Sequence, residues 1–237
     1  METIQSFLIQ AAGQQGILIS QKQADCFQRY MELLLEWNQK MNLTAITEPE
    51  EVAIKHFVDS LLLFKAVVIP EHAKVADVGT GAGFPGIPLA VMRPDLDLTL
   101  LDSLNKRLVF LEAVCNGLEI SSTRVHMRAE EAGRQKAFRE QFDLVTARAV
   151  APLNLLAEYC LPLVKVGGIF AAMKGPGIEE ELAVAKQAVS ILGGKLEEVC
   201  SFLLPDGSKR SIAVIKKIKH TGDRYPRQSA KIAKNPL

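Results

Sequence analysis

The stretch from Val75 to Gly86, VADVGTGAGFPG, constrains the fold of this chain most, because a short apolar run breaks there into closely spaced glycines. The run 75–78 is apolar around a single acid, as expected for a strand that is buried on both faces. Pro85 suits the first turn of a helix that runs to about residue 92. The glycines between them allow positive φ angles and a close approach of the backbone to a ligand, at Gly79, Gly81 and Gly83. The stretch therefore predicts a strand, a ligand-binding loop and a helix.

Two overlapping patterns in this loop indicate different ligands. Gly81, Gly83 and Gly86 satisfy the dinucleotide pattern G-x-G-x-x-G. Asp77, Gly79 and Gly81 instead satisfy the D-x-G-x-G pattern that is typical of S-adenosylmethionine (SAM) methyltransferases. Charge favours SAM, because the Asp77 carboxylate would sit poorly beside an anionic pyrophosphate but attracts an ammonium and a sulfonium. Glycine-rich turns also occur without ligands, and that alternative stays open.

A second acid supports the interpretation as a cofactor loop. Asp102 ends the apolar run 98–101, roughly twenty residues past the glycines, where an acid hydrogen-bonds ribose hydroxyls in nucleotide-binding sheets. The alternative is that Asp102 caps the helix that begins near Ser103. The two roles are compatible.

Composition fits an ordinary globular protein: the 237 residues are 48% hydrophobic and 23% charged. The first ten residues lack the features of a signal peptide, and no apolar run approaches the length of a membrane span. We therefore expect a cytoplasmic protein with no membrane partner. The four cysteines have no metal-ligand spacing, so we expect buried free thiols and no metal site: Cys26, Cys115, Cys160 and Cys200.

The positive charge is concentrated at the C-terminal end. Residues 216–237 contain seven Lys or Arg and one Asp, a net charge of +6 that leaves −5 for the rest of the chain. Such a basic arm suits contact with a polyanion, since each cation that neutralises a phosphate releases counterions. A solvated, disordered terminus is the alternative.

The order of the expected elements predicts an α/β fold. Residues 1–70 read as a helical extension, with one helix after an N-cap at Ser20 and another over 50–67. Residues 71–218 alternate strands and helices, as a SAM-binding domain does, and residues 219–237 form the basic tail. We expect helices near 85–92, 104–117, 130–139, 151–164 and 178–192. We expect strands near 75–78, 97–102, 123–127, 142–146, 168–173, 196–203 and 211–217.

The last two expected strands are joined by a single turn and should form an antiparallel hairpin. The chain is thus expected to build a seven-stranded, mostly parallel sheet with a C-terminal antiparallel hairpin. This is the Rossmann-like arrangement of class I SAM-dependent methyltransferases rather than that of dehydrogenases. The segment between the two N-terminal helices, 36–44, is rich in amides that either bind a ligand or satisfy helix ends and turns.

Ligands in such sheets bind outside the carboxyl ends of the strands. Ala129 and Glu130 follow the third strand, where they meet an adenine edge or simply start a helix. Arg148 follows the fourth strand and Lys174 the fifth, where they suit an anionic substrate or form structural ion pairs.

Residues that are missing from this rim bear on which atom is methylated. No cysteine nucleophile for cytosine C5 and no Asn/Asp-Pro-Pro-aromatic loop for an adenine amine follows the fourth strand, which carries Thr146-Ala147-Arg148-Ala149. The N7 lone pair of guanine is already nucleophilic and needs no general base. Alignment alone then carries the catalysis, with Arg148 and Lys174 as positioning residues.

Together these motifs resemble the glucose-inhibited division protein B family, bacterial SAM-dependent methyltransferases that act on N7 of a guanine in small-subunit (16S) ribosomal RNA. The resemblance spans nearly the whole chain. It rests on the segments 36–38 and 42–44, 55–57 and 59–60, 77–86, 102–107, 128–130, 146–149 and 174–175.

The resemblance implies SAM as cofactor, and the expected contacts are Asp77 and Gly81 from the D-x-G-x-G pattern together with those that the resemblance implies: Gly79, Phe84, Asp102, Ser103, Leu104, Ala129, Glu130 and Arg148. It implies ribosomal RNA or the small ribosomal subunit as partner, contacted by Lys55, His56, Lys106, Arg107, Lys209 and Arg210. A nicotinamide-dependent oxidoreductase and a non-catalytic RNA-binding protein with the same fold are the alternatives.

Overall fold

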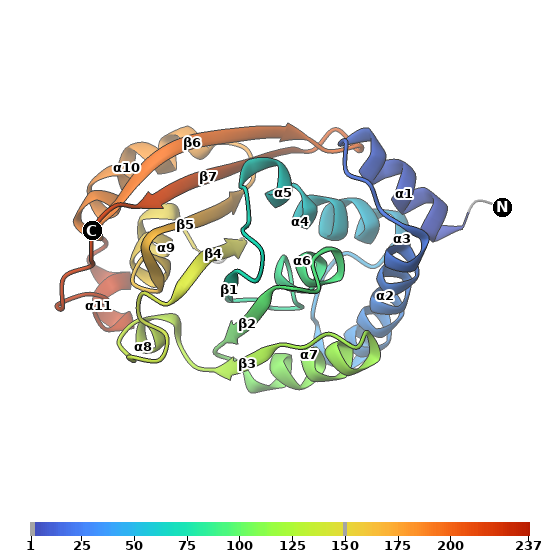
Figure 1. The fold of residues 1–237 in the computed structure, drawn as a ribbon, viewed down its shortest axis with the longest axis horizontal. Coiled ribbons are helices and arrows are strands. Elements are labelled where there is room, and N and C mark those ends of the chain that lie inside the picture. The colour runs from blue at the N-terminus through green and yellow to red at the C-terminus, as the bar shows by residue number, and fades with distance from the viewer. Residues whose placement is uncertain (1–2, 149–150) are drawn as a thin grey trace.

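A seven-stranded sheet organises the computed structural model, which describes residues 3–148 and 151–237 (Figure 1). The strand order is β3-β2-β1-β4-β5-β7-β6. β1 to β5 pair in parallel, whereas β7 runs antiparallel to both β5 and β6. The strands are β1 (Lys74–Val78), β2 (Asp97–Asp102), β3 (Thr123–His126), β4 (Phe142–Arg148), β5 (Val164–Lys174), β6 (Gly194–Leu203) and β7 (Lys209–Lys217). The predicted fold class is therefore confirmed, including the C-terminal hairpin.

Helices cover both faces of the sheet because the central strands are apolar on both. Val75 packs into one hydrophobic core with the N-terminal helices, while Ala76 and Val78 pack into a second core. The first core includes α6 (Gly86–Met92) and α7 (Asn105–Gly117), and the second includes α9 (Leu153–Cys160) and α10 (Ile178–Ile191). Residue 77, between these positions, faces the first core.

The N-terminal extension is helical, as predicted. α1 (Ile4–Gln14) and α2 (Gln21–Met41) both begin with a capping box, and Ser20 is the N-cap of α2 as expected. The helix expected over 50–67 is not regular, however. It consists of α3 (Pro49–Val52), a π-helical turn η1 (Ala53–Val58), α4 (Asp59–Leu61) and α5 (Leu63–Ala66). π-Helical turns often occur at functional sites.

Other boundaries differ from the predictions. The helix expected near 130–139 is a single turn, α8 (Ala129–Ala132). Gly133 follows α8 and packs closely against the C-terminal segment, since a Cβ atom there would lie 3.0 Å from Pro226. β5 begins four residues earlier than expected, and α9 is shorter than 151–164. Residues 1, 2, 149 and 150, which fall within segments considered above, lie outside the described residues.

The C-terminal segment 218–237 packs against the body, so the alternative of a disordered terminus is wrong for these residues. Lys217 is fully buried and pairs with Glu140 at 3.1 Å. Arg227 pairs with the buried Glu158 at 2.6 Å. Ile232, in α11 (Ser229–Lys234), is fully buried. Several cations of the basic arm are therefore held by internal partners.

Helices long and apolar enough to cross a membrane do not occur in residues 3–148 and 151–237. The same residues contain no cluster of three potential metal-ligating side chains. All four cysteines are free thiols, as expected. Cys115 and Cys160 are also buried as expected, whereas Cys26 and Cys200 are only partly buried.

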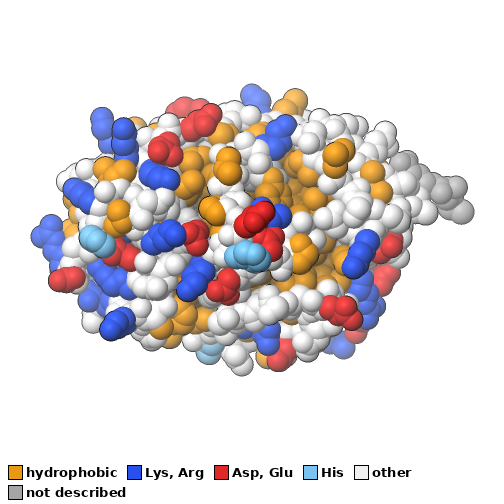
Figure 2. Space-filling model, viewed as in Figure 1, with side chains coloured by type: hydrophobic (Ala, Val, Ile, Leu, Met, Phe, Trp, Pro, Cys, Tyr) orange, Lys and Arg blue, Asp and Glu red, His pale blue; other side chains and the backbone are white. Residues whose placement is uncertain are grey.

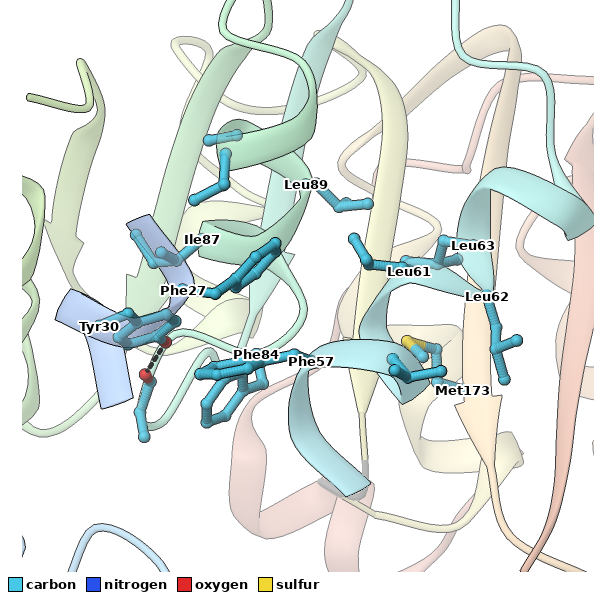
Figure 3. Packing of buried hydrophobic residues seen from close by; sticks show 14 of the residues in the cluster. Phe27, Tyr30, Phe57, Leu61, Leu62, Leu63, Phe84, Ile87, Leu89 and Met173 are labelled. Carbon is cyan, nitrogen blue, oxygen red and sulfur yellow. Dashed lines mark hydrogen bonds between the residues drawn. The ribbon is translucent and has the colours of Figure 1, made fainter. Parts of the chain in front are cut away.

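The loop after β1 rests on aromatic side chains from the extension. Tyr30, Phe57 and Phe84 pack side by side, and the Tyr30 hydroxyl donates to the Ala82 carbonyl at 2.5 Å (Figure 3). Tyr30 is fully buried. The extension thus forms part of the support for the loop.

Replacing Tyr30 with Phe keeps the ring contacts but removes the buried donor to Ala82. We expect the free energy of unfolding, measured in urea, to fall by about 1–3 kcal/mol. Tyr159→Phe is the control, because the Tyr159 hydroxyl makes no hydrogen bond to a described residue, and its effect should stay within about 0.5 kcal/mol. Equal losses in the two variants would contradict this role for the Tyr30 hydroxyl.

Candidate active site

A cavity of about 570 Å³ opens at the carboxyl ends of β1, β2 and β4. Strand ends, the N-terminal extension and the C-terminal segment all contribute to its walls. Those residues are Leu43, Thr44, His56, Val78, Gly79, Thr80, Gly81, Ala82, Phe84, Leu101, Asp102, Ser103, Arg107, Met127, Arg128, Ala129, Glu130, Arg148, Ala151, Tyr159 and Ser229. Most of the residues that the sequence predicted at a cofactor therefore meet in one place.

The glycines of the loop have different roles. Gly81 has a φ of +61°, and a Cβ atom built there would meet only the Gly79 carbonyl oxygen, at 3.8 Å. At Gly83 the same atom would lie 2.5 Å from the Tyr30 hydroxyl, and at Gly86 it would lie 2.9 Å from a carboxylate oxygen of Asp77. Gly83 and Gly86 are therefore needed for packing inside the protein, whereas Gly81 leaves space on the cavity side.

Asp77 lies behind the loop and does not line the cavity. Its Oδ2 atom accepts hydrogen bonds from the Thr80 hydroxyl at 2.7 Å and the Gly86 N–H at 2.9 Å. Oδ1 has no hydrogen-bond partner among the described residues. Burial raises the pKa of Asp77 to about 6. The expectation that this carboxylate directly meets the cofactor's positive groups does not match this geometry, in which it holds the loop from below.

Asp102 joins two loops at the edge of the cavity. Its Oδ2 accepts from the Gly81 N–H at 2.9 Å and from Arg107 at 3.3 Å, and its Oδ1 accepts from the Leu104 N–H at 2.9 Å. α7 begins only at residue 105, with Leu104 as its N-cap, so Asp102 is not the cap considered above. A carboxylate has about four acceptor positions, so one on Oδ1 stays available to a ligand hydroxyl.

Glu130 is the clearest candidate ligand group. Only 7% of the residue is exposed, it lines the cavity, and its carboxylate makes no hydrogen bond to a described residue. The N–H groups of Ala129 and Glu130 open α8 and lack backbone partners within the described chain. An acceptor beside free donors suits a heteroaromatic edge that carries both an amine and a ring nitrogen.

Arg148 is held by the extension. Its guanidinium donates to Asp59 at 2.9 Å, to the Lys55 carbonyl at 3.1 Å and to His56 Nδ1 at 3.2 Å. It also lies over the Phe84 ring, with the guanidinium carbon 4.9 Å from the centroid. Arg148 thus lines the cavity and also forms the structural ion pair that was its alternative.

His56 projects from the π-helical turn η1 and stacks on Phe84, with ring centroids 4.5 Å apart. Burial, and then the Arg148 charge, lower the pKa of His56 to about 3. The imidazole is therefore neutral at pH 7. It does not offer RNA the positive charge that was expected of a basic residue at this position.

Lys174 does not line the cavity. Its amine donates to the Ala151 carbonyl at 2.6 Å and pairs with Glu181 at 2.7 Å, and the side chain is only 9% exposed. Lys174 therefore forms the structural ion pair that was the alternative to contact with an anionic substrate. Lys174 fastens the loop after β4 to α10.

The other predicted cations lie around the site rather than in it. Arg107 lines the cavity beside Asp102, while Lys106 is exposed on the next position of α7. Lys55 pairs with Glu51, and Arg210 of β7 pairs with Asp59 at 3.1 Å. Lys209 is exposed in the same hairpin. On the face seen in Figure 2, Lys and Arg side chains are interspersed with acidic ones.

Sequence reasoning missed the contributions of the two ends of the chain. Thr44 lines the cavity; its signals in the sequence were the composition of the amide-rich segment and the family resemblance of 42–44, but neither gave it a role. Asn38 in that segment satisfies the turn, since its side-chain oxygen accepts from the Leu43 and Thr44 N–H groups at 2.7 and 2.9 Å. Tyr159, on α9, and Ser229, in the C-terminal segment, had no sequence signal, because only tertiary packing brings them to the cavity.

The buried Asp77 should make stability depend on pH. Its pKa is higher in the folded protein than in the unfolded chain, so its contribution is complete below pH 4 and is lost as pH rises towards 6. Between pH 4 and pH 7, the unfolding free energy of Asp77→Asn should improve relative to wild type by about 2 kcal/mol. Urea denaturation across this range measures it, with the exposed Asp97→Asn as control. A constant difference between wild type and Asp77→Asn would contradict it.

Comparison with solved structures supports the fold. A putative methyltransferase from Bacillus halodurans superposes with a TM-score of 0.52 at 16% identity, covering 68% of this chain and 99% of that one. A 16S rRNA (adenine(1408)-N(1))-methyltransferase mutant from Catenulisporales acidiphilia gives a TM-score of 0.53 at 15% identity, covering 67% and 88%. Identity this low shows the methyltransferase fold and nothing narrower.

Sequence comparison is far more specific. The chain is 48% identical to the ribosomal RNA small subunit methyltransferase G of Desulforamulus reducens over 234 residues, 97% of both chains. It is 51% identical to the protein of the same name from Thermoanaerobacter sp. strain X514 over 232 residues, again 97% of both. The family model described as GidB, rRNA small subunit methyltransferase G, matches residues 23–212. With its sheet order and its glycine loop, this chain belongs to the GidB family of SAM-dependent rRNA small subunit methyltransferases.

Proposed function

We propose that this protein is a cytoplasmic enzyme that transfers a methyl group from SAM to N7 of a guanine in the RNA of the small ribosomal subunit. The observation that carries the proposal is the Glu130 carboxylate, which belongs to a residue only 7% exposed, has no hydrogen-bond partner among the described residues and shares a cavity with Asp102. These two groups supply acceptors at the places where an adenosine presents an amine and ribose hydroxyls.

The residues of the cavity fit the parts of the cofactor. Glu130 would accept from the adenine amine, and the free N–H groups of Ala129 and Glu130 would donate to the ring nitrogens. Asp102, beside Ser103 and Leu104, would accept from the ribose hydroxyls. Gly79 and Gly81 let the methionine end lie against the backbone, and Asp77 keeps that backbone in place. When bound, SAM supplies an electrophilic methyl group on a sulfonium.

The protein contributes alignment rather than proton transfer. SAM would supply the methyl group, and the guanine N7 lone pair would take it up without loss of a proton, the electrons of the broken C–S bond remaining on sulfur. The two ionisable groups beside Arg148 already have partners and are not available as a general base. His56 Nδ1 accepts from Arg148, and Asp59 pairs with both Arg148 and Arg210. In this proposal neither acts as a base, and Arg148 and Phe84 are positioning residues.

The exposed cations near the cavity are proposed to hold the RNA backbone. Lys106 and Arg128 are exposed next to the mouth, and Lys209 is exposed in the β6–β7 hairpin. Lys55, Arg107 and Arg210 keep internal acidic partners and contribute less free charge. Lys174 supports the rim through Ala151 rather than touching the substrate.

Methyl transfer tests the proposal directly. Purified protein and SAM with a labelled methyl group are incubated with small subunits, or their RNA, from cells that lack this protein. We expect label at one guanine, mapped by the chain cleavage that reduction and aniline cause at N7-methylguanine. SAM binding without incorporation into either substrate would overturn the proposal.

Asp102→Ala should weaken SAM binding. The change removes the ribose acceptor and releases the Gly81 N–H. We expect the dissociation constant for SAM, measured by calorimetry, to rise roughly 10- to 100-fold, as the loss of one or two hydrogen bonds implies. Asp97→Ala, at the exposed start of the same strand, is the matched control and should bind normally. An unchanged constant in Asp102→Ala would refute this assignment.

A further inference from the structure

Thr44 presents a single hydrogen-bond donor to the cavity, and a chain of buried contacts fixes it there. The chain runs from Asp59 through Arg148 and His56 to Thr44. Thr44 belongs to the N-terminal extension, and none of the roles assigned above to the cofactor site uses it.

The protonation of His56 follows from its neighbours. Nδ1 lies 3.2 Å from Arg148, which only donates, and 3.2 Å from the Lys55 carbonyl oxygen, which only accepts. The Lys55 carbonyl already accepts from Arg148 at 3.1 Å, and a bond from a charged donor is roughly twice as strong as a neutral one, so the tautomer in which Nδ1 accepts from Arg148 is favoured. The proton of the neutral ring is then on Nε2. Nε2 lies 2.8 Å from the Thr44 hydroxyl oxygen and therefore donates to it.

Both acceptor positions of the Thr44 hydroxyl are thereby filled. The Ile46 N–H donates to the same oxygen at 3.0 Å, in addition to His56. A hydroxyl has two lone pairs and one proton, so Thr44 has only its proton left to offer. No described residue accepts that proton, and Thr44 lines the cavity. The Thr44 hydroxyl can therefore donate to an acceptor atom of a ligand, but it cannot accept a hydrogen bond from a ligand's donor group.

Guanine and adenine differ in the group beside N7. Guanine carries the acceptor O6 there, whereas adenine carries an amine, which is a donor. An obligate donor pairs with O6 and repels the amine. It is also neutral, which suits a ring that becomes positively charged on methylation, and Asp59 offsets the charge of the nearby Arg148.

Resting on the proposed function, we propose that the Thr44 hydroxyl donates to O6 of the target guanine and selects guanine over adenine, with His56 as the residue that orients it. Thr44 aligns N7 with the methyl group by holding the adjacent oxygen. His56 acts only through Thr44.

The test compares two target bases and two side chains. Small-subunit RNA is assembled by ligation with guanine or 2-aminopurine at the mapped nucleotide; 2-aminopurine keeps N7 but lacks O6. Thr44→Val should lower kcat/KM for the guanine RNA about 10-fold, as expected for one lost hydrogen bond. It should leave kcat/KM for the 2-aminopurine RNA within about 2-fold of wild type, because no bond is left to lose. Thr44→Ser should restore the activity on guanine.

Different failures point to different conclusions. An equal loss on both RNAs would show that Thr44 is only structural, and a raised dissociation constant for SAM in Thr44→Val would assign the donor to the cofactor; either result overturns the inference. If Thr44→Val does not fold, wild-type enzyme alone decides. It should methylate inosine, which keeps O6, nearly as well as guanine, but 2-aminopurine about 10-fold more slowly. Equal rates on inosine and 2-aminopurine would overturn it. If wild-type enzyme does not methylate the guanine RNA at all, the proposed function itself is wrong.

Discussion

The structure of the site depends on hydrogen bonds that hold the backbone of the glycine loop from outside the loop itself. Asp77 accepts from the Gly86 N–H, Asp102 from the Gly81 N–H, and Tyr30 donates to the Ala82 carbonyl. Each partner is almost fully buried. A loop rich in glycine loses much conformational entropy when it is ordered, and these three contacts, from β1, β2 and α2, offset that cost. The loop is therefore rigid where the proposed cofactor would lie.

The N-terminal extension is part of the site and not merely an attached helical cap. It contributes Tyr30 beneath the loop, Thr44 and His56 in the cavity, and Asp59 as partner of Arg148. Asp59 also pairs with Arg210 on the β6–β7 hairpin, at 3.1 Å. One buried carboxylate thus connects three parts of the chain that are far apart in sequence. Truncating the extension would therefore remove one wall of the cavity as well as a hydrophobic face of the sheet.

Sequence periodicity predicted the sheet well because each strand of this fold is a short apolar run between helices. It also placed Asp102, Ala129, Glu130 and Arg148 together, since carboxyl ends of parallel strands share one edge. It did not show which carboxylate faces the ligand. Asp102 ends β2, but Asp77 lies opposite Leu100, further inside the sheet, and accepts from the Gly86 N–H of α6 beneath the loop. The close packing of Gly133 against Pro226, about ninety residues further on, and the position of Ser229 at the cavity depend on where the C-terminal segment packs, which local patterns do not encode.

The π-helical turn η1 makes the length of its segment as important as its composition. In a π-helix the backbone bonds reach one residue further than in an α-helix, so the turn carries an extra residue relative to regular geometry. Removing a single residue there would let the helix become regular, but would rotate everything beyond the deletion by about 100°. His56 lies within η1 and Asp59 directly after it, and both contact the same guanidinium. Substitutions in this segment should therefore be tolerated far better than the insertion or deletion of a single residue.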